Sequence, residues 1–285
     1  MTGRLVLVAT PIGNLDDLSP RAVASLAEAD VVICEDTRRT GRLLERAGIG
    51  RRRMLVANEH TEAAAAADVG RLLDGGATVA VVTDAGSPGI SDPGERLVRV
   101  AVEGGHDVSA VPGPAAVIAA VTVSGLPAQR FVMEGFLPRQ GRERRDRLHD
   151  LAGERRTIVL YEAPHRLART LGDLVAVLGP DRPVAISREL TKLHEETWRG
   201  LLTEALERSQ AAEPRGEHVL VVAGAPPAAA PEDEQILAAL AAHQAAGLDR
   251  RSAVAAVVAE LSAPKRRVYA LAHQTPPGQA SDGTS

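Results

Sequence analysis

The first half of the chain alternates short apolar runs with longer amphipathic segments. Short apolar runs are typical of buried strands, and amphipathic segments of helices that cover a core. This alternation predicts a mostly parallel sheet with helices packed on its faces. The predicted strands are residues 4–10, 31–34, 54–57, 79–83 and 108–111, and the predicted helices are residues 21–28, 40–47, 62–73, 93–103 and 114–123.

The alternation pauses at Gly125-Leu126-Pro127, and we predict a domain boundary at about residue 125. A second α/β unit follows. Several of its strands succeed one another without an intervening helix, which predicts a mixed sheet. The predicted strands are residues 131–136, 157–161, 184–187, 195–199 and 218–223, and the predicted helices are residues 143–151, 166–178 and 202–212.

A proline-rich stretch, residues 226–231, has the composition of a stiff linker. Three short helices are predicted beyond it, at residues 232–245, 252–261 and 264–272, with Lys265-Arg266-Arg267 opening the last one. The turn between the last two resembles a helix-turn-helix only weakly. Pro, Gly, Ser and Thr dominate the end of the chain, which predicts disorder. The predicted domains are residues 1–125, 126–225 and 226–272, followed by a disordered tail at 273–285.

The amino-acid composition indicates where in the cell the protein is expected. The chain is 45% hydrophobic, which is enough for more than one core. Cys34 is its single cysteine and lies in an apolar run, so an intramolecular disulfide is impossible and a buried structural thiol is expected. The apolar residues 5–9 are too few for the core of a signal peptide. We therefore expect a cytoplasmic protein that does not contact a membrane.

Positive charge is clustered although the net charge is −4. Arginines gather at residues 38–42, 51–53 and 139–147, and nearly all of the cations are arginine rather than lysine. Guanidinium groups match phosphate geometry well, although solvated helix faces explain part of such clusters equally well. Aromatic residues make up only 2% of the chain, which argues against a base-stacking platform for single strands.

The loop at residues 83–94 is the most informative segment. It follows a predicted buried strand and holds three glycines, two prolines and two aspartates. Such a loop keeps a fixed shape and lets its backbone approach a ligand. The loops at residues 10–14 and 111–114 follow other predicted strands, so all three line one crevice if the strands are parallel. Neither a dinucleotide fingerprint nor a Walker loop occurs, which favours a compact ligand with amine, carboxylate and adenosine groups.

Metal and nucleophile chemistry have little support. The histidines are scattered and no metal-binding spacing occurs, so we expect no metal. His60 is a partial exception because it follows a strand at the expected ligand edge. Charged residues also follow strands at positions 35–38 and 188–192. Helix capping and surface ion pairs are the alternative explanation there, but the shared position favours contact with substrate.

Six motifs occur in order along the chain, at residues 7–15, 34–38, 83–94, 111–116, 160–166 and 187–192. Over about residues 4–224 they closely resemble the small-subunit ribosomal RNA methyltransferases of the tetrapyrrole methylase superfamily. The resemblance implies a two-domain α/β homodimer that binds S-adenosylmethionine between its domains. It also implies methyl transfer to the ribose 2′-hydroxyl of a cytidine in the decoding centre of 16S rRNA, within the small ribosomal subunit.

Individual residues are predicted to have roles: the resemblance implies the cofactor contacts, whereas the base follows from the chemistry of methyl transfer and the substrate contacts from charged residues at strand ends and in the arginine clusters. Asp36 is the first candidate for the base that removes the hydroxyl proton, and Lys192 is the second. The expected cofactor-binding residues are Pro11, Asp84, Gly86, Ser87, Pro88, Ile90, Ser91, Ser124, Tyr161, Leu190 and Ala225. The expected substrate-binding residues are Glu35, Arg38, His60, Arg142, Arg144, Arg145 and Arg188.

Two other functions stay open at this point. Methylation of a tetrapyrrole is the alternative within the superfamily, although the motifs at 35–38 and 161–166 and the extra helices argue against it. A regulatory module that binds a nucleotide or cofactor without turnover is the alternative from another class. Thr61 and the segment 215–218 depart from the usual family pattern, which affects only the expected contacts with substrate.

Overall fold

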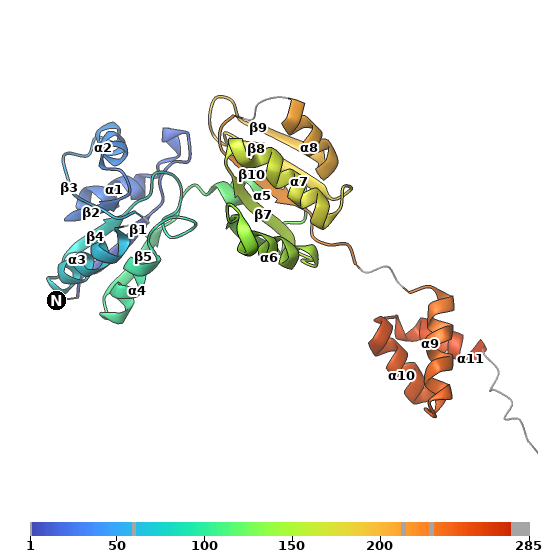
Figure 1. Ribbon diagram of the computed structural model, residues 1–285. Helices are drawn as coiled ribbons and strands as arrows, with labels where there is room; N and C mark the ends of the chain where they lie inside the picture. The colour runs from blue at the N-terminus through green and yellow to red at the C-terminus, as the bar shows by residue number, and fades with distance from the viewer. Residues whose placement is uncertain (1, 59–60, 212–214, 228–230, 275–285) are drawn as a thin grey trace, which may run out of the picture. The chain divides into compact units, whose positions relative to one another are not determined.

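The computed structural model describes residues 2–58, 61–211, 215–227 and 231–274. The chain forms two compact units, Met1–Ala225 and Pro226–Ser285 (Figure 1). The first unit holds two five-stranded sheets, and the described part of the second is helical. The predicted parallel sheet, mixed sheet and helical C-terminal region are therefore confirmed. No helix in the described ranges is long and apolar enough to cross a bilayer.

The first sheet is parallel throughout, with strand order β3-β2-β4-β1-β5. Strands and helices alternate along the chain, so each crossover places a helix on one face of the sheet. The strands are β1 (Arg4–Val8), β2 (Val31–Cys34), β3 (Arg53–Val56), β4 (Thr78–Val81) and β5 (Asp107–Val111). The helices are α1 (Pro20–Glu28), α2 (Thr37–Arg46), α3 (Glu62–Asp74) and α4 (Glu95–Glu103).

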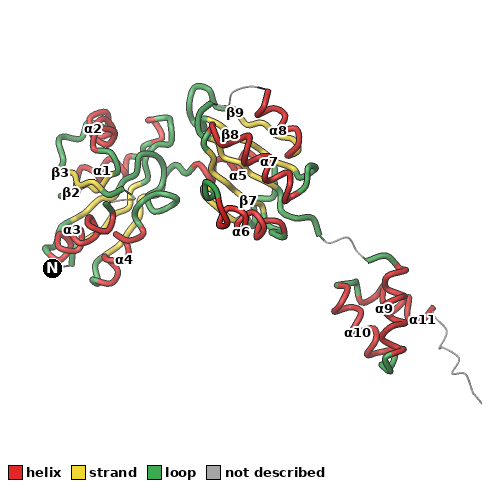
Figure 2. Tube along the Cα trace, viewed as in Figure 1, coloured by secondary structure: helices red, strands yellow, loops and turns green. Residues whose placement is uncertain are grey.

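Successive side chains of these strands enter two separate cores. Leu5 and Ile33 pack with residues of α3 and α4, whereas Val6 and Val32 pack with residues of α1 and α2. This is the period of two that a strand imposes. Because helices cover both faces, the three inner strands β1, β2 and β4 are mostly apolar and buried, whereas the edge strands β3 and β5 are more exposed. Figure 2 shows the loops at the carboxyl ends of these strands on the side next to the second sheet.

The second sheet is mixed, with strand order β6-β7-β10-β8-β9. β6 and β7 are parallel, and every other neighbouring pair is antiparallel. Its strands are β6 (Phe131–Phe136), β7 (Thr157–Glu162), β8 (Pro183–Arg188), β9 (Glu196–Leu201) and β10 (His218–Val222). Its helices α6 (Gly141–Ala152), α7 (Leu167–Leu178) and α8 (Leu202–Ala211) share one apolar core with the sheet.

Helix α5 (Ala116–Ser124) covers the other face of the second sheet. Its Val117 and Val121 pack against Val159 and Val219. The predicted boundary at residue 125 assigned this helix to the first domain, but its contacts lie in the second. The chain thus passes from the first sheet to the second before α5 begins. The domain boundary at residue 125 stays a prediction.

The C-terminal unit consists of α9 (Asp233–Ala245), α10 (Arg250–Leu261) and α11 (Lys265–Gln274). These helices enclose their own small core, which includes Ile236 and Val257. Helix α11 continues two residues into the predicted disordered tail, and the remainder of that tail lies outside the described residues.

Candidate functional site

Two glycine-containing loops meet at the carboxyl end of the first sheet. The backbone N–H of Thr10 donates to the Gly86 carbonyl at 2.9 Å, and the Gly86 N–H donates to the Thr10 carbonyl at 3.1 Å. The Thr10 hydroxyl donates to the Thr83 carbonyl at 3.1 Å. Gly86 has φ +88°, a conformation that a side chain would strain. The edge of the predicted crevice is therefore formed largely by backbone groups that hydrogen-bond to one another.

A cleft of about 990 Å³ opens over these loops and is lined by residues of both sheets. The volume is ample for a nucleoside-sized ligand. The phenol ring of Tyr161 and the ring of Phe136 both line it, with centroids 5.6 Å apart. The sequence-predicted residues that line the cleft are Pro11, Glu35, Asp84, Gly86, Ser87, Ile90, Ser91, Tyr161, Leu190 and Lys192.

Carboxylates cluster on the floor of the cleft. The Glu35 carboxylate accepts a hydrogen bond from the Asp84 backbone N–H at 3.1 Å. One Asp84 oxygen pairs with Arg39 at 3.1 Å, and its other oxygen is buried without a hydrogen-bond partner in the described residues. Burial, together with the charges of Glu35, Asp84 and Glu217, raises the pKa of Asp92 to about 7. A cationic ligand would relieve this repulsion.

Asp36 and Arg38 do not line the cleft. Asp36 is the N-cap of α2, where its carboxylate accepts from the Arg38 backbone N–H at 2.8 Å and pairs with the Arg38 guanidinium at 3.1 Å. These contacts lower the pKa of Asp36 to about 2, so it is a weak proton acceptor. These contacts argue against Asp36 as the base and against Arg38 as a contact inside the cleft, because the two residues satisfy one another at the start of a helix.

The arginines that do face the cleft lie on the next turns of α2. Arg39, Arg42 and Arg46 line it, and their spacing puts them on one face of the helix. Arg39 pairs with Asp84, whereas Arg42 and Arg46 form no ion pair with any residue that the structure describes. The cleft therefore combines an acidic floor with a wall that carries unpaired guanidinium groups.

The loop after β8 closes the cleft from the second sheet. The Lys192 ammonium pairs with Glu189 at 2.9 Å, and the Asn14 backbone N–H donates to the Thr191 hydroxyl at 3.0 Å. A β-carbon on Gly13 would lie 2.4 Å from the Lys192 side chain, so glycine is required for this close approach. Glu189 and Thr191 have positive φ angles of 49° and 66°. Such strained positions gather at functional sites.

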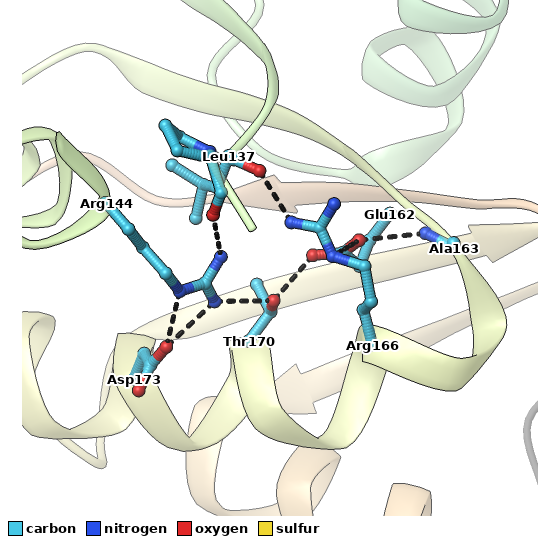
Figure 3. Close-up of polar contacts among 8 residues, drawn as sticks. Leu137, Arg144, Glu162, Ala163, Arg166, Thr170 and Asp173 are labelled. Atoms are coloured by element: carbon cyan, nitrogen blue, oxygen red, sulfur yellow. Dashed lines mark hydrogen bonds and ion pairs between the residues drawn. The ribbon is translucent and has the colours of Figure 1, made fainter. Parts of the chain in front are cut away.

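A buried polar network supports the cleft from behind (Figure 3). Glu162 lines the cleft and is almost fully buried. Its carboxylate pairs with Arg166 at 3.0 Å and accepts from the Thr170 hydroxyl at 2.5 Å. Arg144 donates to Thr170 at 2.8 Å and pairs with Asp173. The network joins β7, α6 and α7, and so fixes the segment that carries Tyr161.

Arg144 consequently cannot bind RNA. Its side chain is 3% exposed, and its guanidinium donates to Asp173, Thr170 and the Pro138 carbonyl. The expectation of a phosphate contact there is corrected because every edge of the group is already used inside the protein. Arg142 and Arg145 on the same helix are exposed and stay candidates, although Arg142 pairs with Asp146.

Other predicted residues lie away from the cleft lining. Pro88 belongs to the loop but does not line the cleft. Ser124 is buried, and its hydroxyl donates to the Val121 carbonyl at the end of α5. Ala225 follows the end of β10 opposite the cleft, where its N–H donates to the Glu154 carbonyl. Neither Ser124 nor Ala225 lines the cleft, so their contacts with the cofactor stay predictions. Arg188 lines a separate cavity, and His60 lies outside the described residues.

Sequence reasoning missed Asp92 and Glu217, and it placed Arg39 and Arg42 in an arginine cluster without separating their helical face from that of Arg38. Asp92 is in the same loop as the predicted ligand contacts, and its position beside other strand-end carboxylates was the signal that could have found it. For α2, taking Asp36 as the N-cap would have set the helical phase and selected Arg39 over Arg38. Cys34 is buried, as expected, and burial raises the pKa of its thiol. No group of three metal-binding side chains occurs among the residues described.

Sequence comparison identifies similar proteins over most of the chain. A family model described as Tetrapyrrole (Corrin/Porphyrin) Methylases matches residues 4–206. A protein of Mycobacterium tuberculosis named Ribosomal RNA small subunit methyltransferase I is 50% identical, over 79% of this chain and 79% of that protein. Proteins of the same name from Synechocystis sp. and Thermotoga maritima are 48% and 46% identical, over 79% and 78% of this chain and 80% and 99% of those proteins.

Structural comparison gives the same fold at lower sequence identity. The methyltransferase CobJ matches with a TM-score of 0.60 and 22% identity, covering 79% of this chain and 95% of that one. The uroporphyrin-III C-methyl transferase of Thermus thermophilus, complexed with S-adenyl homocysteine, matches with a TM-score of 0.55 and 21% identity. That match covers 78% of this chain and 97% of the other.

Proposed function

Because the chain belongs to the tetrapyrrole methylase family, and within it to the ribosomal RNA small subunit methyltransferase I group, we propose that it methylates small-subunit ribosomal RNA. The proposed acceptor is the ribose 2′-hydroxyl of a decoding-centre cytidine in 16S rRNA, and the methyl donor is S-adenosylmethionine. The observation that carries the proposal is a single cleft with a carboxylate floor and an arginine wall. A homodimer and a cytoplasmic location, where small subunits occur, belong to the same proposal.

The residues of the cleft fit the methyl donor. The buried, unpartnered oxygen of Asp84 and the raised pKa of Asp92 both mark a site that favours positive charge. When bound, S-adenosylmethionine supplies a methyl group on a positively charged sulfur. Tyr161 and Phe136 offer aromatic surface for an adenine. The residues proposed to hold the donor are Pro11, Asp84, Gly86, Ser87, Ile90, Ser91, Tyr161 and Leu190.

The acceptor hydroxyl needs a group to take its proton. Asp92 lines the cleft, and its pKa of about 7 suits a proton acceptor at neutral pH. We assign it this role in place of Asp36: Asp92 would take the proton of the ribose hydroxyl, whose oxygen would receive the methyl group that S-adenosylmethionine supplies. Lys192, the second candidate that the sequence indicated, also lines the cleft, and its ion pair with Glu189 suits it to donate hydrogen bonds to the acceptor.

RNA binding is proposed to depend on Arg42 and Arg46 of α2, which have no ion-pair partner among the described residues. Replacing Arg42 and Arg46 together by alanine is expected to weaken binding to the small subunit about tenfold or more, because two charge-assisted phosphate contacts are lost. The slope of log Kd against log salt should fall by about 0.7 for each lost contact. Filter binding over a salt series measures both quantities.

Arg38→Ala is the matched control, since Arg38 is on the same helix but is 83% exposed and paired with Asp36 away from the cleft. Unchanged binding is expected for this variant. Equal losses for Arg38→Ala and for the Arg42/Arg46 double variant would show that the helix contributes only general charge, and would contradict the proposed RNA wall.

A further inference from the structure

A second cavity, of about 340 Å³, lies on the helix-covered face of the second sheet. Its lining contains three arginines, Arg188, Arg208 and Arg215, against one glutamate, Glu196. The arginines come from β8, from α8 and from the segment before β10. None of the three is among the residues proposed to hold the donor or to take the hydroxyl proton. Its excess of positive charge favours an anion.

The charged rim of this cavity is preorganised. Glu196 lies between two of the arginines: it pairs with Arg188 at 2.8 Å and with Arg208 at 2.6 Å. Arg215 forms no ion pair within the described ranges of the chain and is exposed. One carboxylate thus orients two guanidinium groups, and the third remains accessible to a ligand. A phosphate would meet cations that are already held in place.

The strand register brings a buried histidine to the same row. His218 of β10 is opposite Arg188 of β8, and Arg188 is opposite Glu196 of β9. Directly opposed residues point to the same face of a sheet. The His218 side chain is 5% exposed, and its Nδ1 atom is buried without a hydrogen-bond partner among the described residues. An unpaired polar atom at this depth is costly unless a ligand completes it.

The floor of the cavity is apolar and includes the single tryptophan of the chain. Ile186 and Trp198 are opposed in the register, on the same face of the sheet as Arg188 and Glu196, and both pack against the core beneath α7 and α8. An indole can stack on a nucleobase while neighbouring cations bind the phosphate, so this lining suits a nucleotide. His218 lines both this cavity and the main cleft, so the two sites are adjacent.

We propose that this cavity is a subsite for one nucleotide of the RNA substrate, with its phosphate on the arginines and its base beside Trp198. The proposal rests on the proposed function in taking RNA as the substrate. It gives Arg188, which the sequence had marked for substrate contact, a location next to the donor cleft rather than inside it. A nucleotide neighbouring the acceptor would be held there.

Trp198 makes the proposal measurable without turnover. Titrating the full-length protein with a hexacytidylate RNA, in the absence of donor, is expected to change the tryptophan fluorescence saturably. The double variant Arg208→Ala/Arg215→Ala should weaken this binding about tenfold or more, since both residues are exposed rim cations. Arg169→Ala, a substitution in α7 outside the cavity lining, is the control and should bind as the unmodified protein does.

Two further ligands test whether the cavity binds a nucleotide within RNA or a free phosphate compound. Cytidine monophosphate and inorganic phosphate are expected to bind much more weakly than the hexanucleotide. If cytidine monophosphate binds as tightly and the hexanucleotide does not displace it, the cavity is a site for free nucleotides and the RNA assignment is overturned. Absence of any fluorescence change also overturns it. Failure of the proposed function would instead appear as absent methyl transfer to small subunits, which this titration does not measure.

Discussion

Replacing Asp92 by asparagine is expected to lower kcat for methyl transfer about 100-fold or more, while the dissociation constant for S-adenosylmethionine changes less than about tenfold. The amide keeps the size of the side chain but cannot accept the hydroxyl proton. Steady-state turnover with saturating small subunits measures the first quantity, and calorimetric titration of the donor measures the second. A donor-binding defect with an unchanged kcat would contradict the assignment of Asp92 as base.

The pH dependence gives the same assignment a second test. The pKa of Asp92 is raised to about 7, so the ionised form that accepts a proton is lost as the pH falls through 7. The single-turnover rate of the unmodified protein should therefore decline below pH 7, and Asp92→Asn should abolish this decline. Asp107→Asn, at the opposite end of the first sheet, is the control and should retain it.

Stability should change in the opposite direction from activity. Because the folded-state pKa of Asp92 lies above its unfolded value, its contribution to stability is present at low pH and is lost as the pH rises through about 7. At pH 8 the ionised carboxylate is a net cost to the folded protein, so Asp92→Asn should unfold at the same temperature or a higher one. Thermal unfolding followed by circular dichroism checks this, and a lower midpoint would indicate a structural role.

Replacing Arg144 by alanine is expected to destabilise the α/β unit by about 3–5 kcal/mol, because the change leaves Asp173 and the Thr170–Glu162 pair without their buried cationic partner. For a unit of this size the unfolding midpoint should fall by roughly 10 °C. Thermal unfolding at pH 7.5 measures the change.

Arg145→Ala is the matched control for this prediction, since Arg145 is the next residue of the same helix and is exposed. Its effect should be within about 0.5 kcal/mol. Equal and small effects of both substitutions would mean that the buried network contributes little to stability. RNA binding is expected to show the opposite order. Arg145→Ala can remove a phosphate contact, whereas Arg144→Ala cannot, because only the Arg145 side chain reaches solvent.

The pattern of apolar and polar residues predicted the two sheets. It did not predict which individual side chains are buried and which are exposed. Apolar runs located the strands of the parallel sheet, and the absence of helices between strands predicted the mixed one. In the arginine cluster of α6, however, charge was equated with exposure. Arg144, Leu148 and Leu151 share one helical face and are all buried. The 3.6-residue period would have separated Arg144 from Arg142 and Arg145, whereas composition could not.

The candidate site was predicted in part for a related reason. Loop residues such as Asp84 and Ser87 were located correctly at the cleft because strand ends fix where loops gather. Electrostatic coupling was not predictable: the raised pKa of Asp92 arises in part from carboxylates that are far apart in sequence, Glu35 and Glu217. Likewise, the strand pairing that aligns His218, Arg188 and Glu196 exists only once the sheet has formed.

The most direct test of the central claim is methyl transfer from radiolabelled S-adenosylmethionine to small ribosomal subunits isolated from cells that lack this activity. We predict label in 16S rRNA, on the ribose of a single cytidine of the decoding centre, with no label in a tetrapyrrole acceptor. Label in a tetrapyrrole alone, label on a base rather than a ribose, or donor binding without any transfer would contradict the proposed function.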